Sequence, residues 1–361
     1  MTTLRILSLT SEQLMADARA SLERGHGWAD LVYREVMRTG DYDPDRLGMN
    51  RSVSSAWKTR YVRTPLSVKE TFEESTSDGR TTIKAVFETE DGLEIEAVRI
   101  PMRRERYTLC VSSQVGCRLA CAFCETGRMG LIRNLRADEI VAQVVSARAV
   151  LGWSISHIVF MGMGEPLDNV HELVKALKVL ADPRGLAFAQ PRLRVCTAGH
   201  VKGLDVLKEL GWPRLDISVS LNAPTDEKRN RLMPINRHVP LHRLQEALVA
   251  YREVSRSVFA VNYCLLPGLN DGAADAEAVA AFCRPLGRCI VHVIPYNPGS
   301  RPLTRAPEDH EVDRFSSYLK EAGVPVQRRR TKGRSVMAAC GQLGNLELRT
   351  QRQRRLPVYD A

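Results

Sequence analysis

The sequence lacks any long apolar run: no stretch of its 361 residues approaches the roughly 18 apolar residues that a membrane span needs. It also lacks the basic start, apolar stretch and small-residue cleavage site of an export signal, because Arg5, Glu12 and Asp17 interrupt a helix-like pattern at the beginning of the chain. Internal repeats and low-complexity stretches are absent as well. We therefore expect a cytoplasmic protein without membrane contact, with about two domains or one large domain and an appendage.

Extremes of composition are missing too. Hydrophobic residues make up 44% and charged residues 26% of the chain, which excludes the collagen-like, disordered and disulfide-miniprotein classes. The charge is unbalanced, since 52 Lys and Arg against 42 Asp and Glu leave a formal net charge of +10, and this favours a polyanionic partner such as a nucleic acid. Nine cysteines, an odd number in a chain without an export signal, indicate metal-binding or catalytic sulfur rather than a disulfide framework.

From residue 107 onward, short β-branched runs alternate with longer helical patterns. We predict strands at residues 107–112, 157–161, 192–196, 215–221, 258–265 and 289–294, and helices at residues 137–151, 169–180, 201–210, 241–254, 273–282 and 310–322. Because several strands are apolar throughout, helices should cover both faces of a parallel sheet. The pattern predicts an α/β fold, a partial (β/α)6 barrel, whose active site would lie at the carboxyl ends of the strands.

The beginning of the chain has a different pattern. Short helical patterns at residues 11–22, 29–37 and 66–72 predict a small helical accessory domain. Two extended runs, residues 81–87 and 93–100, flank Glu90-Asp91-Gly92, and an Asp-Gly pair in such a place is typical of a hairpin turn. We therefore divide the chain into an accessory domain (1–75), a β-hairpin linker (76–102), the barrel (103–335) and a C-terminal segment (336–361).

Three cysteines follow the first predicted barrel strand, in the sequence Cys117-Arg-Leu-Ala-Cys121-Ala-Phe-Cys124. Three thiolates can hold three irons of a [4Fe–4S] cluster and leave the fourth iron open to another ligand. No fourth cysteine follows closely, and no second Cys or His pair has the spacing of zinc ligands. An open iron–sulfur cluster is therefore the favoured interpretation, with a zinc site and inert buried thiols as alternatives.

With Phe123 before the third cysteine, this loop resembles that of the radical S-adenosylmethionine (SAM) superfamily, in which the three cysteines ligate the cluster and the open iron binds SAM. Four flanking motifs resemble the RlmN/Cfr family of radical SAM RNA adenosine methyltransferases. They are Thr108-Leu-Cys-Val-Ser-Ser-Gln-Val-Gly-Cys117, Gly162-Met-Gly-Glu-Pro166, Leu232-Met-Pro-Ile-Asn236 and Ala338-Ala-Cys-Gly-Gln-Leu343. The resemblance runs from the hairpin to about residue 343 and so covers most of the chain.

The resemblance implies one [4Fe–4S] cluster on Cys117, Cys121 and Cys124. It also implies SAM contacts at the ends of the strands, at Gly164, Glu165, Cys196, Ser220, Leu221, Asn222 and Asn297. A glycine beside a carboxylate suits a ligand with an ammonium group, although a tight turn explains such a glycine equally well. Two positions depart from the family's pattern, since Cys196 stands where Ser is common and Asn222 where His is common. A radical SAM enzyme with a different substrate is therefore an open alternative.

The resemblance assigns chemical roles to three further residues. Cys340, which as a lone cysteine would otherwise be a buried structural thiol, would take a methyl group from SAM by displacement. A radical from a second SAM would then remove hydrogen from that methyl group, which makes two SAM per turnover. Cys110 would release the RNA adduct through a transient disulfide with Cys340. Glu96, on a strand where a carboxylate is usually solvated, would accept the proton of the adenine carbon.

The remaining cysteines fall in strand or helix patterns, and we expect small core residues at Cys264, Cys283 and Cys289.

Basic residues cluster at residues 328–334, directly before Cys340, and again at Arg349, Arg352, Arg354 and Arg355. Such runs are usually solvated surface, but here they would bring positive charge to the place where an RNA backbone must arrive.

The sequence thus predicts a radical SAM methyltransferase that modifies an adenosine, at carbon 2, in large-subunit ribosomal RNA and in some cases transfer RNA. We expect a monomer that receives electrons from a flavodoxin-type reductant. Three alternatives stay open: methylation at carbon 8, a radical SAM enzyme with another substrate, and a non-catalytic RNA-binding module with a structural cluster. The presence of both Cys110 and Cys340 argues against the last, because binding alone needs neither thiol.

Overall fold

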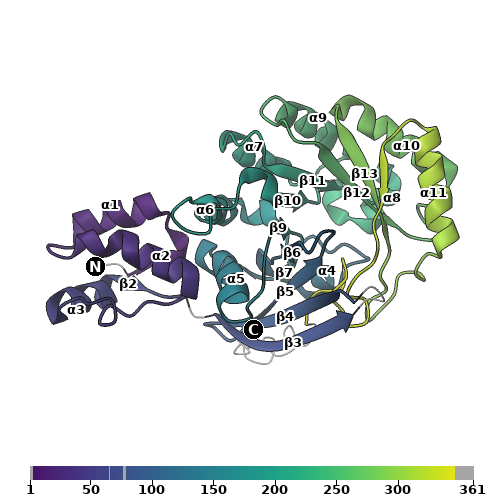
Figure 1. The fold of residues 1–361 in the computed structure, drawn as a ribbon. Coiled ribbons are helices and arrows are strands. Elements are labelled where there is room, and N and C mark those ends of the chain that lie inside the picture. Colours follow the sequence, from purple (N-terminus) through teal and green to yellow (C-terminus); the bar gives the residue numbers. More distant parts are fainter. Residues whose placement is uncertain (1–2, 65, 76–78, 346–361) are drawn as a thin grey trace, which may run out of the picture.

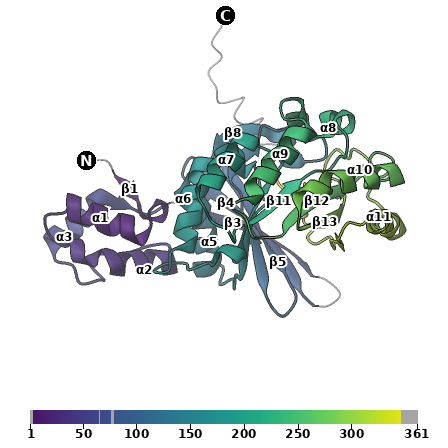
Figure 2. The same ribbon diagram turned by 90° about the horizontal axis from the view of Figure 1, so that it is seen from above.

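The computed structural model describes residues 3–64, 66–75 and 79–345. A group of short helices lies at one end of the molecule and an α/β body at the other, where helices α10 (Ala273–Cys283) and α11 (Asp309–Glu321) lie farthest from the short helices (Figures 1 and 2). None of the helices in the described parts of the chain has the length and apolar composition that crossing a membrane requires.

A mixed sheet of ten strands forms the centre of the α/β body. Its parallel strands are neighbours in chain order: β6 (Tyr107–Cys110), β9 (His157–Phe160), β10 (Leu193–Thr197), β11 (Asp216–Ser220), β12 (Phe259–Leu265), β13 (Cys289–Pro295) and β14 (Val326–Arg328). The six predicted barrel strands are therefore confirmed. The described strands form an open sheet rather than a closed barrel, with β14 at one edge.

Helices cover the parallel strands, and all six predicted helices are present. They are α5 (Ala137–Ala149), α6 (Val170–Ala181), α7 (Val201–Glu209), α9 (Leu241–Arg252), α10 and α11. Two shorter helices, α4 (Glu125–Met129) and α8 (Asp226–Leu232), were not expected. Apolar strand residues such as Ile158 and Val195 are fully buried in the main core together with Leu177 of α6. Burial of this kind explains why the strands are apolar throughout.

An antiparallel extension continues the sheet beyond β6. It consists of β5 (Glu94–Pro101), β4 (Thr81–Thr89) and β3 (Leu66–Ser75). The predicted hairpin is confirmed as β4 and β5, and Gly92 in its turn has φ +73°, a conformation that favours glycine. A separate antiparallel pair, β7 (Gln114–Cys117) and β8 (Gly130–Asn134), encloses the cysteine loop.

The predicted helix at residues 66–72 is wrong, because this segment forms β3. It pairs with β4 from Leu66 opposite Thr89 to Ser75 opposite Thr81, with a bulge after Val68. Leu66 and Val68 are two residues apart, a strand spacing, and both pack against the main core. Pairing along the whole of β4 thus overrides a weak local helical pattern.

Three helices lie in the N-terminal part of the chain, where an accessory domain was predicted: α1 (Ser11–Ser21), α2 (Ala29–Thr39) and α3 (Arg51–Arg60), of which α3 was not predicted. A short parallel pair, β1 (Leu4–Arg5) with β2 (Tyr61–Val62), joins the two ends of the domain. The domain packs on the α/β body through Asp182 after α6, which accepts hydrogen bonds from the Ser11 backbone N–H (2.6 Å) and hydroxyl (3.1 Å).

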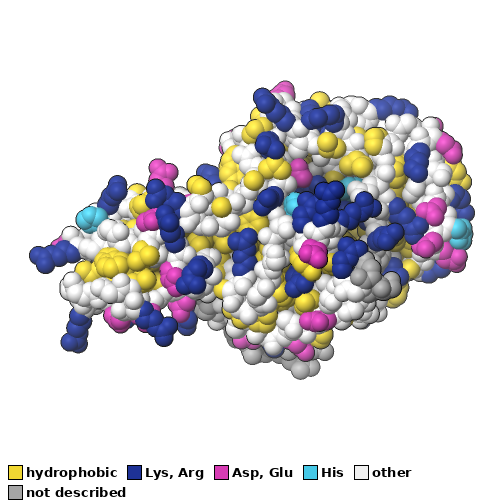
Figure 3. All heavy atoms as spheres, viewed as in Figure 1, with side chains coloured by type: hydrophobic (Ala, Val, Ile, Leu, Met, Phe, Trp, Pro, Cys, Tyr) yellow, Lys and Arg dark blue, Asp and Glu magenta, His cyan; other side chains and the backbone are white. Residues whose placement is uncertain are grey.

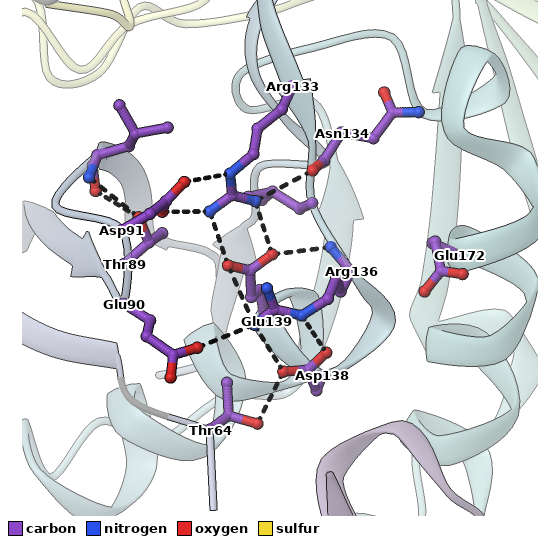
Figure 4. Close-up of polar contacts among 12 residues, drawn as sticks. Thr64, Thr89, Glu90, Asp91, Arg133, Asn134, Arg136, Asp138, Glu139 and Glu172 are labelled. Carbon is purple, nitrogen blue, oxygen red and sulfur yellow. Dashed lines mark hydrogen bonds and ion pairs between the residues drawn. The ribbon is translucent and has the colours of Figure 1, made fainter. Parts of the chain in front are cut away.

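A network of charged side chains joins the hairpin turn, β8 and α5 (Figure 4). Arg133 of β8 donates to both oxygens of Asp91 in the hairpin turn (2.6 and 2.8 Å) and to both oxygens of Glu139 in α5 (2.9 Å each). Glu139 is buried, and the neighbouring Asp138 accepts a hydrogen bond from Thr64 at the end of the accessory domain (3.0 Å). The network thus fixes the hairpin that carries Glu96 against the strand pair that carries the cysteine loop.

Replacing Arg133 by Met should lower the free energy of unfolding by about 1–3 kcal/mol, because the buried Glu139 carboxylate would lose the guanidinium that binds both its oxygens and would keep only the contacts with Arg136. Arg38→Met is the matched control, since Arg38 and Glu35 form an exposed pair on α2, and its removal should cost less than about 0.5 kcal/mol. Urea denaturation of both variants measures the difference. Equal losses would show that the network does not stabilise the fold.

The same network predicts a pH dependence. The hydrogen bond from Arg133 is the largest cause that lowers the pKa of Asp91 to about 2. A carboxylate with a lowered pKa stabilises the fold above its unfolded pKa of roughly 4, and this contribution is lost as the pH falls toward the folded value. The stability difference between the parent and Arg133→Met should therefore narrow as the denaturation series moves into this acidic range.

Candidate active site

The cysteine loop leaves the end of β7 and enters α4. Cys117 is the last residue of β7, and Cys124 is the residue directly before α4, with its backbone N–H bonded to the carbonyl of Cys121 (3.1 Å). Gly116 lies within β7 at an irregularity of its pairing with β8, has φ +77°, and a Cβ there would lie 1.9 Å from the carbonyl oxygen of Gly130. The sequence therefore needs glycine at this position for the loop to close.

The three thiols lie close enough to act on one another. Burial raises the pKa of Cys117, Cys121 and Cys124, and in Cys117 and Cys121 the other cysteines of the loop raise it further. Backbone N–H groups of the loop and the Arg229 guanidinium lower these pKa values again. Donors aimed at buried sulfurs are what thiolate ligands of an iron–sulfur cluster require, so the residues fit the group.

In the structure the three thiols lie near one another but are not arranged as metal ligands. Among the described residues, no group of three or more His, Cys, Asp or Glu side chains is arranged to hold a metal ion. Burial makes deprotonation of these thiols costly when no metal is bound. A bound metal would displace the thiol protons and stabilise the thiolates.

The segment with Cys340 lies against the cysteine loop. The Glu125 N–H at the start of α4 donates to the carbonyl of Gly341 (2.8 Å), and the Thr126 hydroxyl donates to the carbonyl of Leu343 (2.5 Å). From the end of β13, the Asn297 amide donates to the carbonyl of Cys340 itself (3.4 Å). The motif around Cys340 therefore serves to place it beside the three predicted cluster ligands.

Cys340 is also the centre of a group of thiols. Its charge raises the pKa of Cys110, Cys196 and Cys264 after the larger effect of burial, and Cys124 acts on Cys340. Cys340 is an exposed residue, yet desolvation by the surrounding segments raises the pKa of its thiol, and Arg329 opposes this. All of these cysteines are free thiols in the structure.

Cys264 was missed as a member of this group. The sequence predicted a small core residue, and the prediction holds for Cys283 and Cys289, which are buried in the main core. Cys264 instead lies half-buried on β12, beside a second apolar cluster that also contacts Cys121 and Phe123. A strand position alone does not tell which face of the sheet a cysteine occupies.

Glu96 on β5 is buried and lies at the same site. One carboxylate oxygen accepts a hydrogen bond from the Gly344 N–H (2.9 Å), and the other lies 3.3 Å from the ammonium of Lys84 on β4. Burial raises the pKa of Glu96, and Lys84 and the Gly344 N–H oppose that rise. Glu96 is therefore not the solvated carboxylate that a strand usually carries.

Gly164 and Glu165 follow β9 as expected. Gly164 has φ +101°, and a Cβ there would lie 2.6 Å from Cβ of Gln114. Burial raises the pKa of Glu165 to about 7, and its carboxylate accepts hydrogen bonds from the N–H groups of Ala198 (2.7 Å) and Leu167 (3.1 Å). The carboxylate thus joins the end of β9 to the end of β10.

The other predicted SAM contacts lie on adjacent strand ends. The Cys196 sulfur is 3.4 Å from the Ser220 hydroxyl and accepts from the Asn262 amide at the same distance. Asn222, which follows the buried Leu221, has φ +56°, and its side-chain oxygen accepts the N–H of Cys264 (2.9 Å). Asparagine tolerates this left-handed conformation well, which is a local reason for its presence here.

Arg229 of α8 ties these strand ends together, and the sequence reasoning did not find it. It is completely buried, and it donates to the carbonyls of Ala198, Ser220 and Leu221 and to the Asn236 side chain (2.9 Å). Burial lowers its pKa to about 10. Asn236 is the last residue of the Leu232–Asn236 motif, and Arg229 stands one helical turn before that motif. This position next to the motif was the sequence signal that could have indicated Arg229.

The basic residues 328–330 do not form one exposed surface. Arg328 is paired with Asp309 and with Asp313 (2.7 Å), Arg329 is half-buried beside Cys340, and Arg330 is exposed. The second run, Arg349 to Arg355, lies outside the described residues. Figure 3 shows Lys and Arg side chains gathered over the middle of the α/β body on this face of the molecule.

Comparisons with known proteins define the class. The family model of the radical SAM superfamily matches residues 111–281, which contain the cysteine loop and the ends of β9, β10, β11 and β12. The crystal structure of a radical SAM methyltransferase from Sphaerobacter thermophilus superimposes with a TM-score of 0.85 at 35% identity, covering 94% of this chain and 98% of that one. The protein is a radical SAM enzyme, and this superfamily implies a [4Fe–4S] cluster and SAM.

Curated relatives define the family more narrowly. A probable dual-specificity RNA methyltransferase RlmN 1 from Protochlamydia amoebophila is 39% identical over 357 residues, 98% of this chain and 97% of that protein. A dual-specificity RNA methyltransferase RlmN from Syntrophotalea carbinolica is 43% identical over 272 residues, 75% of this chain and 72% of that protein. The chain belongs to the RlmN family of radical SAM RNA methyltransferases.

Replacing Gly164 by Ala should cost about 2–4 kcal/mol of stability, because the new Cβ would push Gln114 away and strain the backbone. The matched control is Gly152→Ala, since Gly152 also has positive φ (+66°) but open space around it, and we expect a cost of about 1 kcal/mol. Thermal unfolding compares the two. A cost for Gly164→Ala no larger than that of the control would show that the end of β9 adapts freely.

Proposed function

We propose that this protein methylates carbon 2 of an adenosine in ribosomal RNA, and of transfer RNA in some cases, through a methyl group carried on Cys340. The observation that carries the proposal is the convergence on the Cys340 segment of four groups that lie far from it in the sequence. Cys340 lies among the cysteine loop, Cys110 and the strand ends, and four residues further on the same segment binds Glu96. The name dual-specificity RNA methyltransferase, which two of the relatives carry, supports both classes of RNA.

Each protein group would have a defined task. The Cys340 thiolate, favoured by Arg329, would attack the methyl carbon of SAM, so that an S–C bond forms and the neutral thioether of SAM leaves. Cys117, Cys121 and Cys124 would hold the cluster, which with SAM supplies a radical able to remove hydrogen from the carried methyl group. Radical chemistry is needed because an aromatic carbon of adenine has no lone pair to act as a nucleophile.

Glu96 and Cys110 would complete the transfer. Glu96 would accept the proton from the adenine carbon after the carried carbon has bonded to it, and one electron would return from the base to the cluster, so that the ring becomes aromatic again. The buried position of Glu96 keeps water away from its carboxylate. Cys110, at the end of β6, would attack the Cys340 sulfur as a thiolate, so that an S–S bond forms and the bond from sulfur to the carried carbon breaks. The electron pair of the broken bond stays with the methylated base, which then takes up a proton.

Labelling tests this proposal directly. Anaerobically reconstituted protein, a one-electron reductant and methyl-labelled SAM are incubated with ribosomal and transfer RNA, and the nucleosides are analysed by mass spectrometry. We expect labelled 2-methyladenosine. Labelled 8-methyladenosine would overturn the position, and cleavage of SAM to 5′-deoxyadenosine without labelled RNA would overturn the substrate.

Cys110→Ala should trap the covalent intermediate, because the thiol that releases RNA from Cys340 would be missing. We expect a protein–RNA adduct, seen as nuclease-sensitive mass on the peptide that contains Cys340. Cys283→Ala is the matched control, since Cys283 is buried in the main core away from this site. Protein free of RNA in both variants would rule out release by Cys110.

A further inference from the structure

Lys84 is a charged residue in a place where a strand usually carries an apolar side chain. It lies on β4, is nearly as buried as Glu96, and its ammonium is 3.3 Å from the Glu96 carboxylate on β5. The ring of Phe72 on β3 covers the ammonium at 4.9 Å from the ring centroid. A buried lysine is costly unless it is paired, so the pair with Glu96 needs an explanation beyond general stability.

The pair touches both ends of the segment that carries Cys340. Glu96 accepts the Gly344 N–H (2.9 Å), and Lys84 donates to the carbonyl of Met337 (3.5 Å). Two neighbouring carboxylates extend this attachment: Glu94 accepts from the Asn345 side chain (3.0 Å), and Glu74 accepts the Ser335 N–H (2.7 Å). The polar side chains of β3, β4 and β5 thus hold the Cys340 segment along its length.

The charged surroundings of Glu96 are simple. Lys84 acts on it from β4 and Glu94 from its own strand, while the Cys340 segment contributes the backbone N–H of Gly344. On the other side, β6 brings the Cys110 thiol close, since Cys110 pairs with Val98 two residues after Glu96. Among these groups Lys84 is the cation, so it opposes the effect of burial and of Glu94 on the charge of Glu96.

We propose that Lys84 is a positioning residue for the methyl transfer to RNA: it keeps Glu96 ionised and oriented while it binds the segment that carries Cys340. The inference rests on the proposed role of Glu96 as proton acceptor. When the proton arrives on Glu96, the attraction to Lys84 and the charge-assisted bond to Gly344 both weaken. Acceptance of the proton is thereby coupled to loosening of the segment whose sulfur Cys110 must next attack.

The test separates two half-reactions in the full-length reconstituted protein. Methyl transfer from SAM to Cys340 is followed by peptide mass spectrometry and does not involve Glu96. Methyl transfer to RNA is followed by nucleoside mass spectrometry between about pH 6 and pH 9, the range in which a perturbed carboxyl base would titrate. The variants are Lys84→Met, Lys84→Arg and Glu96→Gln, and Lys208→Met on α7 is the control because its pair with Glu253 involves none of the residues that bind the Cys340 segment.

We expect Lys84→Met to keep Cys340 methylation within about twofold and to lower RNA methylation near neutral pH by about tenfold, since one unit of pKa changes the ionised fraction of a protonated base about tenfold. Because loss of Lys84 raises the pKa of Glu96, the activity should recover as the pH rises. Lys84→Arg should restore most of the activity at neutral pH, and Lys208→Met should leave both half-reactions unchanged.

Two results would overturn the inference. One is an RNA methylation profile of Lys84→Met with unchanged pH dependence. The other is an equal loss of both half-reactions without rescue by Arg, which would show a structural role alone. Failure of the proposed function is distinguishable from either result: then Glu96→Gln would methylate RNA normally, or the parent protein would carry no methyl group on Cys340.

Discussion

The site depends on one constraint: the segment that carries Cys340 has no strand or helix of its own, so side chains from distant parts of the chain must hold it. Among the described residues it receives hydrogen bonds from Asn297 after β13 and from the start of α4, and it donates to Glu96 on β5. A segment held at both sides by polar contacts can bring a thiol to within reach of several partners and still move during a reaction. Such mobility suits the proposed function, in which the Cys340 sulfur would react first with SAM and later with Cys110 while its carried carbon bonds to the base.

The fold was largely predictable because its signals are local. Continuously apolar strands and amphipathic helices of the α/β body have clear periodicity, and the Asp-Gly turn fixes the hairpin at Gly92. The error at residues 66–72 has the opposite cause, since β3 is a strand only because β4 lies beside it. The open sheet agrees with the predicted partial barrel, because six β/α units are fewer than the eight that close a full barrel.

Site residues that belong to a sequence motif could be predicted, whereas residues that join the site only through contacts in the folded chain could not. Cys117 to Cys124 and Cys340 stand in recognisable motifs, and the structure brings them together. Lys84 and Glu96 lie on neighbouring strands, but the segment that they bind is about 250 residues away in the sequence, so no spacing rule reveals the contact. Asn222, a departure from the family's pattern, uses its side chain to bind the backbone at Cys264, which a residue comparison alone does not show.

Arg229 is a buried cation close to the cysteine loop, and its charge is stabilised by nearby groups. Its hydrogen bonds go to neutral carbonyl and amide oxygens, and burial lowers its pKa to about 10, so the guanidinium is held in the interior at a cost in free energy. The two groups that oppose this cost are Cys121 and Asp226. Cys121 bears a charge only as a thiolate, which burial disfavours and which a metal would stabilise. The Arg229 cation and the Cys121 thiolate therefore stabilise each other's charged forms, which suits the predicted role of Cys121 as a thiolate ligand of the cluster.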